Sequence, residues 1–327
     1  MLDVVRAREL PTRPAERRWL VDQLWGEEAV GVLGGEPKCF KSFLSLDIAV
    51  AVAAGRPCLR HFAVSHPGRV VLFAAEDALW EVRRRLEGIA RAAGVLFDTL
   101  DIHVITVPVV RLDIARDREE LEATIAMLKP RLVILDPFVR LHRVDENAVT
   151  EVAPLLAYLR GLQRKHQTAV LLVHHARKGA AHMRGGQALR GSSELHAWGD
   201  SNLYMRRRPS GLTLTMEHRN APSGGGLALD FVTRDTAAAL EIVERAPEET
   251  RAKSMAIPPE ERILHALETA GGPVTMRQLR MASQMRGETV SAVLGQTILK
   301  GLVERADGGY RLTATAKIAR KVIPAAS

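Results

Sequence analysis

Apolar, strand-like runs alternate with helix-like segments over residues 29–205 of this 327-residue chain. The apolar runs are almost continuous, which is typical of strands that are buried on both faces. We expect strands at 29–35, 69–77, 101–107, 131–138 and 168–178. Helices are expected between them, at 41–55, 80–94, 118–130 and 152–166. This alternation predicts an α/β fold with a mostly parallel central sheet covered by helices.

The C-terminal third of the chain has a different pattern. The segments SNLYMRRR and GLTLTMEHRN predict the two strands of a hairpin, and residues 244–259 are rich in charge and proline, which is typical of a linker. Residues 260–327 then predict three short helices followed by a strand, a glycine turn and a second strand. Three helices and a terminal hairpin form the pattern of a small winged helix-turn-helix domain.

Charge and composition limit the classes of function. The net charge is +8, and residues 251–327 hold 12 Lys/Arg against 6 Asp/Glu, so most of the excess lies in the tail. A basic domain favours a polyanionic partner, although solubility alone also explains such a charge. No apolar run approaches the ~18–20 residues of a membrane helix. With no signal-like N-terminal stretch and two cysteines, we expect a cytoplasmic protein without a membrane partner.

The segment GEPKCFKS, residues 35–42, resembles a phosphate-binding loop of the form G-x-x-x-x-G-K-[ST]. It lies between an expected strand and an expected helix, which is the context that such a loop needs. Backbone amides, a lysine and a hydroxyl group would then bind the phosphates and Mg²⁺. The predicted nucleotide-binding residues are Gly35, Glu36, Pro37, Lys38, Cys39, Phe40, Lys41, Ser42 and Phe43.

Phe40 occupies the position of the second glycine in this loop. If the position requires a positive φ, a phenylalanine there is strained. If it does not, the backbone amide still serves and the side chain costs nothing. Lys38 adds a second cation to the loop, which either contacts phosphate or stays solvated.

Acidic residues follow two of the other expected strands. Asp136 ends the run RLVILDPF, where a carboxylate can bind Mg²⁺ or can simply be a strand-end acid. Glu76 and Asp77 follow the strand at 69–77, and Asp77 also suits the N-terminus of the next helix. Because ligands of open parallel sheets bind beyond the carboxyl ends of the strands, we expect Lys41, Glu76, Asp136 and His174 to gather at one edge.

Five segments in this order resemble the RepA-like branch of RecA-type ATPases, which are related to hexameric replicative helicases. They are GEPKCFKS, AAED, LVILDPFVRLHRVDEN, LLVHHARKG and RGSSELHAWGDSNLYMRR, within a resemblance that covers about residues 18–232. Loops of the form G-x-P-K-x-F-K-S recur in that branch, so the resemblance implies an active site with Phe40. Together with the patterns described above, it predicts this domain organisation: 1–28 a candidate subunit-packing arm, 29–243 a RecA-like ATPase domain, 244–259 a linker and 260–327 a winged-helix domain.

The resemblance implies a role for each residue of this site, with ATP and Mg²⁺ as the cofactors. Lys41 would contact the β- and γ-phosphates, and Ser42 and Asp136 would hold the Mg²⁺. Glu76 would polarise the attacking water. His174 stands where relatives have a γ-phosphate sensor, and His175 is expected to pack inward.

The resemblance also implies an arginine that acts on a neighbouring subunit. The segment HRNAPSGG (218–225) is similar to the hairpin that carries such an arginine in ring helicases, which makes Arg219 the candidate. Relatives often have a lysine at the position of Glu217, and Arg190 is the alternative candidate. A residue that acts in trans requires a homo-oligomer, for which we expect a hexameric ring.

Two regions predict contacts with DNA. The glycine-rich loop at 176–191 carries Arg177, Lys178, Arg184 and Arg190 without acidic residues, and it would track single-stranded DNA through its charge alone or be an ordinary surface loop. The winged-helix region carries basic residues for duplex DNA, although many such domains dock proteins instead. These residues are Arg277, Arg280, Arg286, Arg305 and Arg311.

Together these features favour a DNA-associated ATPase that drives translocation, unwinding or loading in replication. The first alternative is a DNA-binding regulator in which the nucleotide acts only as a switch. The second alternative is a recombination or repair accessory without helicase activity. Glu76 and Asp136 favour hydrolysis, whereas Phe40 and Glu217 favour a switch.

Overall fold

The computed structural model of the chain describes residues 4–9, 19–175, 193–208, 211–219, 221, 224–244, 258–283, 285 and 287–316. The chain divides into two compact units, Met1–Pro247 and Glu248–Ser327, and each unit has a hydrophobic core of its own. Within the described ranges, no helix is both long enough and apolar enough to cross a membrane.

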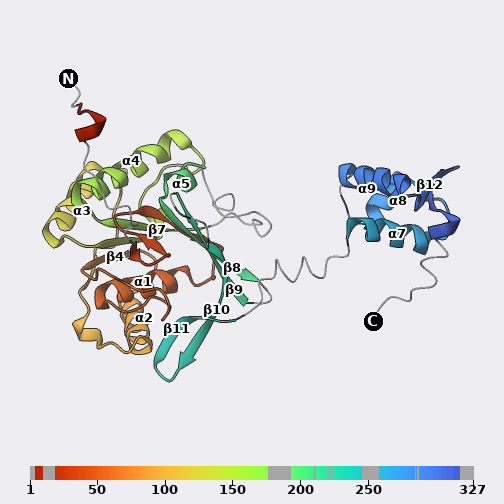
Figure 1. Cartoon of the computed structure of the whole chain (residues 1–327). Coiled ribbons are helices and arrows are strands. Elements are labelled where there is room, and N and C mark those ends of the chain that lie inside the picture. Colours follow the sequence, from red (N-terminus) through yellow and green to blue (C-terminus); the bar gives the residue numbers. More distant parts are fainter. Residues whose placement is uncertain are drawn as a thin grey trace. The chain divides into compact units, whose positions relative to one another are not determined.

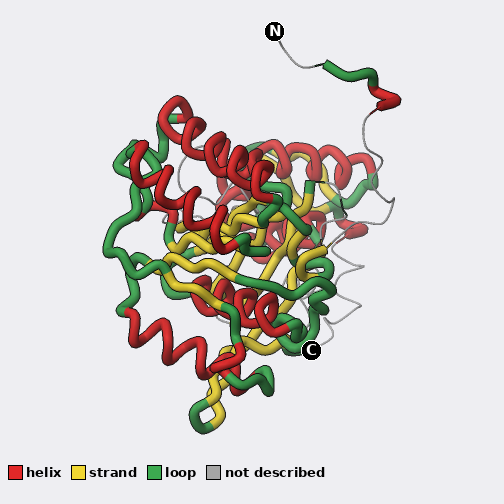
Figure 2. Tube along the Cα trace, turned by 90° about the vertical axis from the view of Figure 1, so that its left-hand side faces the viewer, coloured by secondary structure: helices red, strands yellow, loops and turns green. Residues whose placement is uncertain are grey.

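The larger unit is built around one nine-stranded sheet (Figures 1 and 2). Its strands follow the order β11-β10-β9-β8-β3-β7-β6-β4-β5, and the six strands from β8 to β5 run parallel. The predicted α/β fold with a mostly parallel sheet is therefore confirmed. The parallel strands are β3 (Val30–Gly35), β4 (Val70–Ala74), β5 (Ile102–Val104), β6 (Leu132–Asp136), β7 (Ala169–His175) and β8 (Ser201–Arg208).

Alternate residues of the central strands enter two separate cores, because successive side chains of a strand point to opposite faces. Leu33 packs on the face that α1 and α2 cover, whereas Val32 packs on the face that α3 and α4 cover (Figure 1). This two-sided burial explains why the strands are continuously apolar in sequence. The helices are α1 (Lys41–Ala54), α2 (Leu79–Ala92), α3 (Ala115–Leu128) and α4 (Val149–His166).

The sheet continues beyond β8 as an antiparallel extension. β9 (Gly211–His218) pairs with β8, as the predicted hairpin requires. Two further strands, β10 (Gly224–Arg234) and β11 (Ala237–Ile242), were not predicted from the sequence. β10 begins with three glycines and β11 with three alanines, which are not typical of strands, although β10 continues with the strand-like run LALDFVT.

Part of the segment before β3 is packed into the larger unit and does not form a separate arm. The short strands β1 (Trp19–Val21) and β2 (Trp25–Gly26) pair with each other, and the indole of Trp25 is fully buried in the core. The 3₁₀ turn Ala7–Glu9 has no buried residue. Of the predicted 1–28 arm, residues 19–28 thus contribute to the packed domain.

The smaller unit contains the three helices and the hairpin that the sequence predicts. The helices are α7 (Pro259–Ala270), α8 (Met276–Ser283) and α9 (Gly287–Leu299), and the hairpin is β12 (Val303–Ala306) with β13 (Gly309–Leu312). Val274 also bridges to Tyr310, which ties the segment before α8 to the hairpin. Leu264, Leu279 and Leu294, one from each helix, lie in their common core.

Candidate functional site

The loop between β3 and α1 lies at the carboxyl edge of the parallel sheet. Gly35 ends β3, and a Cβ atom there would lie 2.4 Å from the backbone oxygen of Met205 in the adjacent strand β8. This close approach explains the glycine. α1 then begins at Lys41 without a side-chain cap and without an acidic residue in its first turn. The first-turn amides of α1 are therefore suited to an anion such as a phosphate group.

Phe40 adopts the left-handed backbone conformation that its glycine-like position suggested, with φ 64° and ψ 26°. Lys38 is also left-handed, with φ 61°. For L-residues other than glycine this region costs roughly 1–2 kcal/mol. Of the two possibilities left open by the sequence, the strained one is observed, so the loop needs support from its surroundings.

Lys41 lies inside the loop and is 5% exposed. Its Nζ donates hydrogen bonds to the carbonyl oxygens of Gly35 at 3.0 Å and Glu36 at 2.7 Å. Burial lowers the pKa of Lys41, while the nearby Cys39 and Asp136 raise it. The ammonium group is thus held beside the first turn of α1, where it can neutralise a phosphate that binds to the amides.

The Ser42 hydroxyl and the Asp136 carboxylate lie next to each other at this loop. The Ser42 hydroxyl hydrogen-bonds the carboxylate of Asp136, which ends β6. Burial by surrounding protein atoms raises the pKa of Asp136 to about 6, and the nearby Asp77 and Glu76 also raise it. A hydroxyl and a carboxylate beside a phosphate cradle are the hard oxygen donors that Mg²⁺ prefers, so these residues fit that ion.

Glu76 and Asp77 follow β4 but have different partners. Glu76 is partly exposed and forms an ion pair at 2.8 Å with Arg140, which follows the end of β6. Asp77 instead pairs at 2.8 Å with Arg85 of α2, which also pairs with Glu81. Asp77 therefore has the helix-terminal, structural environment that the sequence suggested, whereas Glu76 remains the candidate for chemistry.

One pocket of about 450 Å³ brings Lys41, Ser42, Glu76 and Asp136 together at the carboxyl edge of the sheet. Of the four residues predicted to converge, Lys41, Glu76 and Asp136 line this pocket, whereas His174 does not. The remaining residues that line the pocket are Lys38, Cys39, Phe40, Phe43, Ala74, Asp77, Glu81, Arg85, Val173, His175 and Arg207.

The two histidines at the end of β7 are arranged differently from our expectation. His175, not His174, lines the pocket. His174 is 1% exposed, and its Nδ1 lies 3.8 Å from Oε1 of Glu146, beside the ring of Phe138. Neighbouring residues of a strand face opposite sides of the sheet, and the α1 side holds Val173 and therefore His175.

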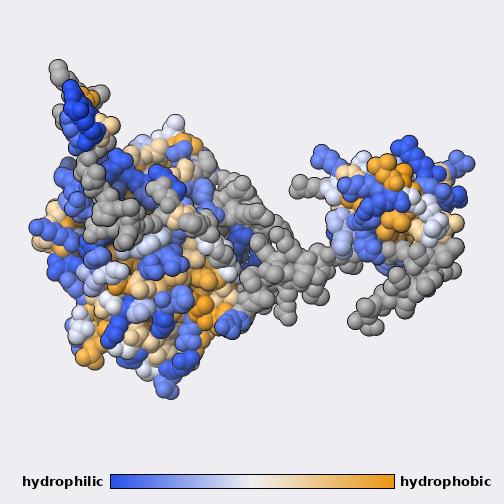
Figure 3. All heavy atoms as spheres, in the orientation of Figure 1, coloured by the Kyte–Doolittle hydropathy of each residue, from blue (hydrophilic) through white to orange (hydrophobic). Residues whose placement is uncertain are grey.

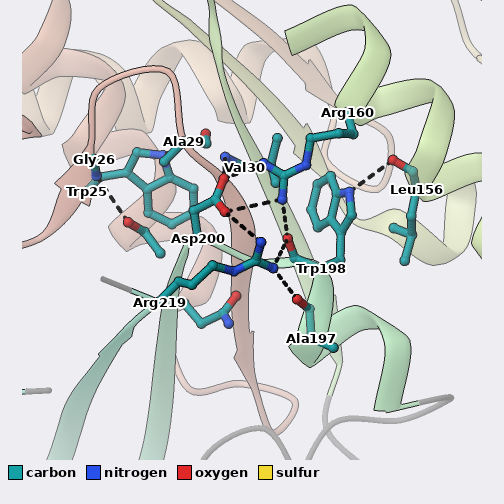
Figure 4. Close-up of polar contacts among 12 residues, drawn as sticks. Trp25, Gly26, Ala29, Val30, Leu156, Arg160, Ala197, Trp198, Asp200 and Arg219 are labelled. Carbon is teal, nitrogen blue, oxygen red and sulfur yellow. Dashed lines mark hydrogen bonds and ion pairs between the residues drawn. The ribbon is translucent and has the colours of Figure 1, made fainter. Parts of the chain in front are cut away.

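Arg219 lies at the opposite edge of the sheet, just beyond the end of β9. Asp200 donates its backbone N–H to the carbonyl oxygen of Val30 at the first residue of β3, which fixes the position of this edge. Nη1 of Arg219 lies 3.5 Å from the Asp200 carboxylate, and its Nη2 donates to the carbonyl oxygens of Ala197 and Trp198 (Figure 4). The guanidinium group therefore does not reach the pocket of its own subunit.

An oxygen of the Glu217 carboxylate lies 3.6 Å from Nδ1 of His196. The four basic residues of the 176–191 loop, Arg177, Lys178, Arg184 and Arg190, lie outside the described residues, as does Arg286. Their predicted contacts with DNA, and the alternative role of Arg190, thus stay predictions.

The described basic residues of the smaller unit lie at its surface. Arg277 and Arg280 are on α8, Arg305 is on β12, and Arg311 is on β13, where it pairs with Glu304 at 2.7 Å. α9 itself contains no lysine or arginine. The face in Figure 3 shows apolar side chains among hydrophilic ones on this unit, so its surface is not uniformly basic.

Sequence reasoning missed two contributors to the pocket and one to its surroundings. Arg85 of α2 and Arg207 of β8 line the pocket, and Phe231 of β10 stacks on Phe40. The run of three arginines that ends β8 was a usable signal, because this strand is parallel to β3 and ends at the same edge. Phe231 was missed because its strand was not predicted.

Comparisons with known proteins identify the family and the fold. Residues 1–181 match a protein family that is described as an AAA domain. A DnaB-like replicative helicase, solved in a study of its interactions with primase, has a TM-score of 0.50 at 13% identity. That match covers 65% of this chain and 57% of the helicase chain.

Two further solved structures are similar at lower scores. The RadB recombinase has a TM-score of 0.48 at 16% identity, over 67% of this chain and 92% of that chain. A KaiC-like protein from the hyperthermophilic archaeon Pyrococcus horikoshii has a TM-score of 0.48 at 10% identity, over 70% and 100% of the two chains.

Proposed function

The chain belongs to the family described as an AAA domain, with a RecA-like P-loop ATPase core, and we propose that it is a DNA-associated ATPase of the RepA-like type. In this proposal it hydrolyses ATP between the subunits of an oligomer and uses the energy to translocate on, unwind or load onto DNA. The observation that carries the proposal is the convergence of Lys41, Ser42, Glu76 and Asp136 in one pocket.

The phosphate-binding part of the proposal rests on the first turn of α1. The uncapped amides of this turn bind the phosphates, and Lys41 exchanges its neutral carbonyl partners for the charged β- and γ-oxygens, which form stronger hydrogen bonds. Ser42 and Asp136 hold Mg²⁺, which when bound neutralises phosphate charge. The pocket volume of about 450 Å³ is suited to a ligand of this size.

Hydrolysis further requires a group that orients the attacking water. Glu76 lines the pocket and has a carboxylate that is 43% exposed, so a water molecule can reach it. Its ion pair with Arg140 fixes the carboxylate at the mouth of the pocket. His175 lines the same pocket, and we assign it the γ-phosphate contact that the sequence had suggested for His174.

Arg219 is proposed to complete the site of a neighbouring subunit. Along the strand direction, Arg219 lies beside Val30, at the start of β3. Val30 precedes Gly35 in the loop by five residues, a distance of roughly 17 Å at ~3.3 Å per residue. This separation from its own pocket supports an action in trans. An arginine that acts in trans makes the assembly of a ring, which we propose to be a hexamer, necessary for turnover.

DNA contacts are assigned to the basic 176–191 loop for single strands and to the C-terminal unit for duplexes. The three helices and hairpin of that unit support a winged-helix domain, with Arg277, Arg280, Arg305 and Arg311 as its phosphate contacts. Because α9 lacks basic residues, such contacts would come from α8 and the hairpin, and binding would depend on charge more than on sequence.

Two observations favour the alternative of a nucleotide-gated regulator without turnover. Phe40 is left-handed although it is not glycine, and an acidic residue, Glu217, stands two positions before Arg219. A switch of this kind would bind ATP tightly and hydrolyse it negligibly. The two functions thus differ in turnover rather than in binding.

Binding and turnover of Mg·ATP, measured on the same protein, separate the two functions. We expect the wild-type protein to bind and hydrolyse ATP, and Lys41→Ala to abolish hydrolysis. Lys165→Ala is the matched control, because this exposed lysine on α4 pairs with Glu122 far along the chain from the loop. Tight binding without turnover in the wild type would favour the regulator instead.

A further inference from the structure

Two residues of the phosphate-binding loop, Lys38 and Phe40, are left-handed although neither is glycine. Such backbone conformations persist only where the surrounding structure fixes them. α1 gives no side-chain cap at Phe40, so this support must come from elsewhere. The contacts of these two residues show where the support lies.

The ring of Phe40 contacts one residue of β10 and one residue of β8. It stacks on Phe231 of β10 with a centroid distance of 4.6 Å and an interplanar angle of 20°. On β8, the guanidinium carbon of Arg207 lies 5.9 Å from the centroid of the Phe40 ring. Phe43 of α1 completes the cluster with edge contacts to both rings, at 6.2 Å to Phe40 and 4.8 Å to Phe231.

Arg207 also contacts the other left-handed residue. Its Nη1 donates a long hydrogen bond of 3.4 Å to the carbonyl oxygen of Lys38. Phe40 is therefore contacted from β8 and β10, and Lys38 from β8. The loop and α1 supply the rings of Phe40 and Phe43 to this cluster of described aromatic rings.

We propose that Phe231 and Arg207 are positioning residues that hold the phosphate-binding loop in its left-handed conformation, where a glycine would need no such support. Phe231 acts through the ring of Phe40, and Arg207 acts through that ring and the carbonyl group of Lys38. The aromatic stack changes an equilibrium constant by roughly 2- to 12-fold, which offsets much of a backbone cost of roughly 5- to 30-fold. The inference rests on the proposed function in that the loop binds the phosphates of ATP.

A competing role for Phe231 is to stack directly on the base of the nucleotide. The face of Phe231 that could do so is covered by Phe40, whose ring would have to move. The two roles differ in a simple way, because inorganic tripolyphosphate has phosphates and no base. A positioning residue affects both ligands, whereas a base-stacking residue affects only ATP.

The test combines Phe231→Ala with Phe40→Gly, and measures the binding of ATP and of inorganic tripolyphosphate, each with Mg²⁺, by calorimetry. Phe231→Ala is expected to weaken both ligands by about 5- to 10-fold. In the Phe40→Gly background the same substitution should change both affinities less than about twofold, because glycine adopts a positive φ without a partner. Arg207→Ala should also weaken both ligands, but Phe40→Gly should remove only part of this loss, because Arg207 still contacts the carbonyl oxygen of Lys38.

Phe97→Ala is the matched control, since Phe97 also packs at the edge of the core with an arginine, Arg83, over its ring at 5.2 Å. It should leave both affinities unchanged. If Phe231→Ala does not fold, Phe231→Leu replaces it in the test, because leucine keeps the apolar contact but removes the aromatic face. It should give a smaller loss that Phe40→Gly again removes.

Three results would overturn the proposal. Loss of ATP affinity with unchanged tripolyphosphate affinity would assign Phe231 to the base. An equal loss from Phe231→Ala in the wild-type and Phe40→Gly backgrounds would show that Phe231 acts independently of Phe40. Urea unfolding of the wild type, the two single variants and the double variant supplies a readout without nucleotide, and additive effects there would exclude the coupling. If the wild type binds neither ligand, the proposed function fails, while the unfolding cycle still decides whether the two rings are coupled.

Discussion

The guanidinium group of Arg219 lies 3.5 Å from the carboxylate of Asp200, at the edge of the sheet opposite the phosphate-binding loop. Asp200 also forms an ion pair with Arg160 of α4, so two arginines converge on one carboxylate (Figure 4). Asp200 thereby fixes the direction of Arg219 on the edge that a neighbouring subunit would meet. The proposed action of Arg219 in trans leads to the first prediction.

Arg219→Ala is expected to retain ATP binding and to reduce the rate of hydrolysis by at least roughly 10³-fold, the scale of an arginine supplied in trans. Lys41→Ala is expected to be inactive for a different reason, because its own pocket fails. In mixed oligomers, an Arg219→Ala subunit keeps an intact pocket and can receive Arg219 from a Lys41→Ala neighbour. Mixing the two inactive variants should therefore restore measurable hydrolysis.

Arg116→Ala provides the control for this experiment, because Arg116 is an exposed arginine of α3 that pairs with Glu120 one turn along the same helix. It should hydrolyse ATP at the wild-type rate. Full activity of Arg219→Ala alone would contradict the assignment, as would a mixture of the two variants that stays inactive under conditions in which they co-assemble.

Glu76 and Asp77 are adjacent and both acidic, so they form a matched pair. Glu76→Gln is expected to lower turnover by roughly 10²- to 10⁴-fold while ATP binding stays intact, because it removes the group that orients water. Asp77→Asn should keep turnover within about tenfold of the wild-type rate, because the Asp77 carboxylate forms an ion pair with Arg85 and has no role in hydrolysis. Steady-state rates of ATP hydrolysis by both variants test this assignment. A larger loss of rate in Asp77→Asn than in Glu76→Gln would make Asp77, not Glu76, the residue that orients water.

The pKa of Asp136 gives a prediction for the dependence of stability on pH. Burial raises this pKa from 3.8 to about 6. Between about pH 4 and pH 6 the unfolded chain therefore loses the proton that the folded chain still holds. The free energy of unfolding then decreases as the pH rises, by about 3 kcal/mol at most, because Asp136 retains some opening to the pocket.

Urea unfolding of nucleotide-free wild type and Asp136→Asn, at several pH values across this range and above it, isolates this effect. The asparagine has no proton to lose, so its stability relative to the wild type should increase with pH. A stability difference that does not vary with pH would show that the carboxyl group titrates normally in the folded protein.

The C-terminal unit gives a prediction that concerns DNA. Ending the chain at Pro247, the boundary of the first unit, should weaken binding to duplex DNA by at least about tenfold and reduce its salt dependence. Arg280→Ala in the full chain should remove one phosphate contact, so the slope of log binding constant against log salt concentration should become shallower by about 1. Lys300→Ala is the control, because that lysine pairs with Glu260 at 2.6 Å. Unchanged duplex binding after truncation would make this unit a protein-docking domain.

The fold of the larger unit was predictable wherever a strand is buried on both faces. The runs around Val32, Leu72 and Ile134 could not be anything but core, and their alternation with helices determined the sheet. The antiparallel strands β10 and β11 were not predicted, because each begins with glycines or alanines; the run LALDFVT within β10 was a usable signal that was missed.

The centre of the site was also predictable, because Lys41, Ser42, Glu76 and Asp136 each follow or end a recognisable element. The choice between His174 and His175 was not, since it depends on which face of β7 meets α1. The support of Phe40 could not be predicted either. Phe231 lies 191 residues later in the chain, in a strand that was not predicted.

Hydrolysis of ATP by the purified full-length protein, with and without single-stranded and duplex DNA, tests the central claim most directly. The account predicts Mg²⁺-dependent turnover that DNA stimulates and that Lys41→Ala abolishes. Tight binding of ATP without turnover, in the presence of either form of DNA, would contradict it and would leave a nucleotide-gated DNA-binding regulator as the function of this chain.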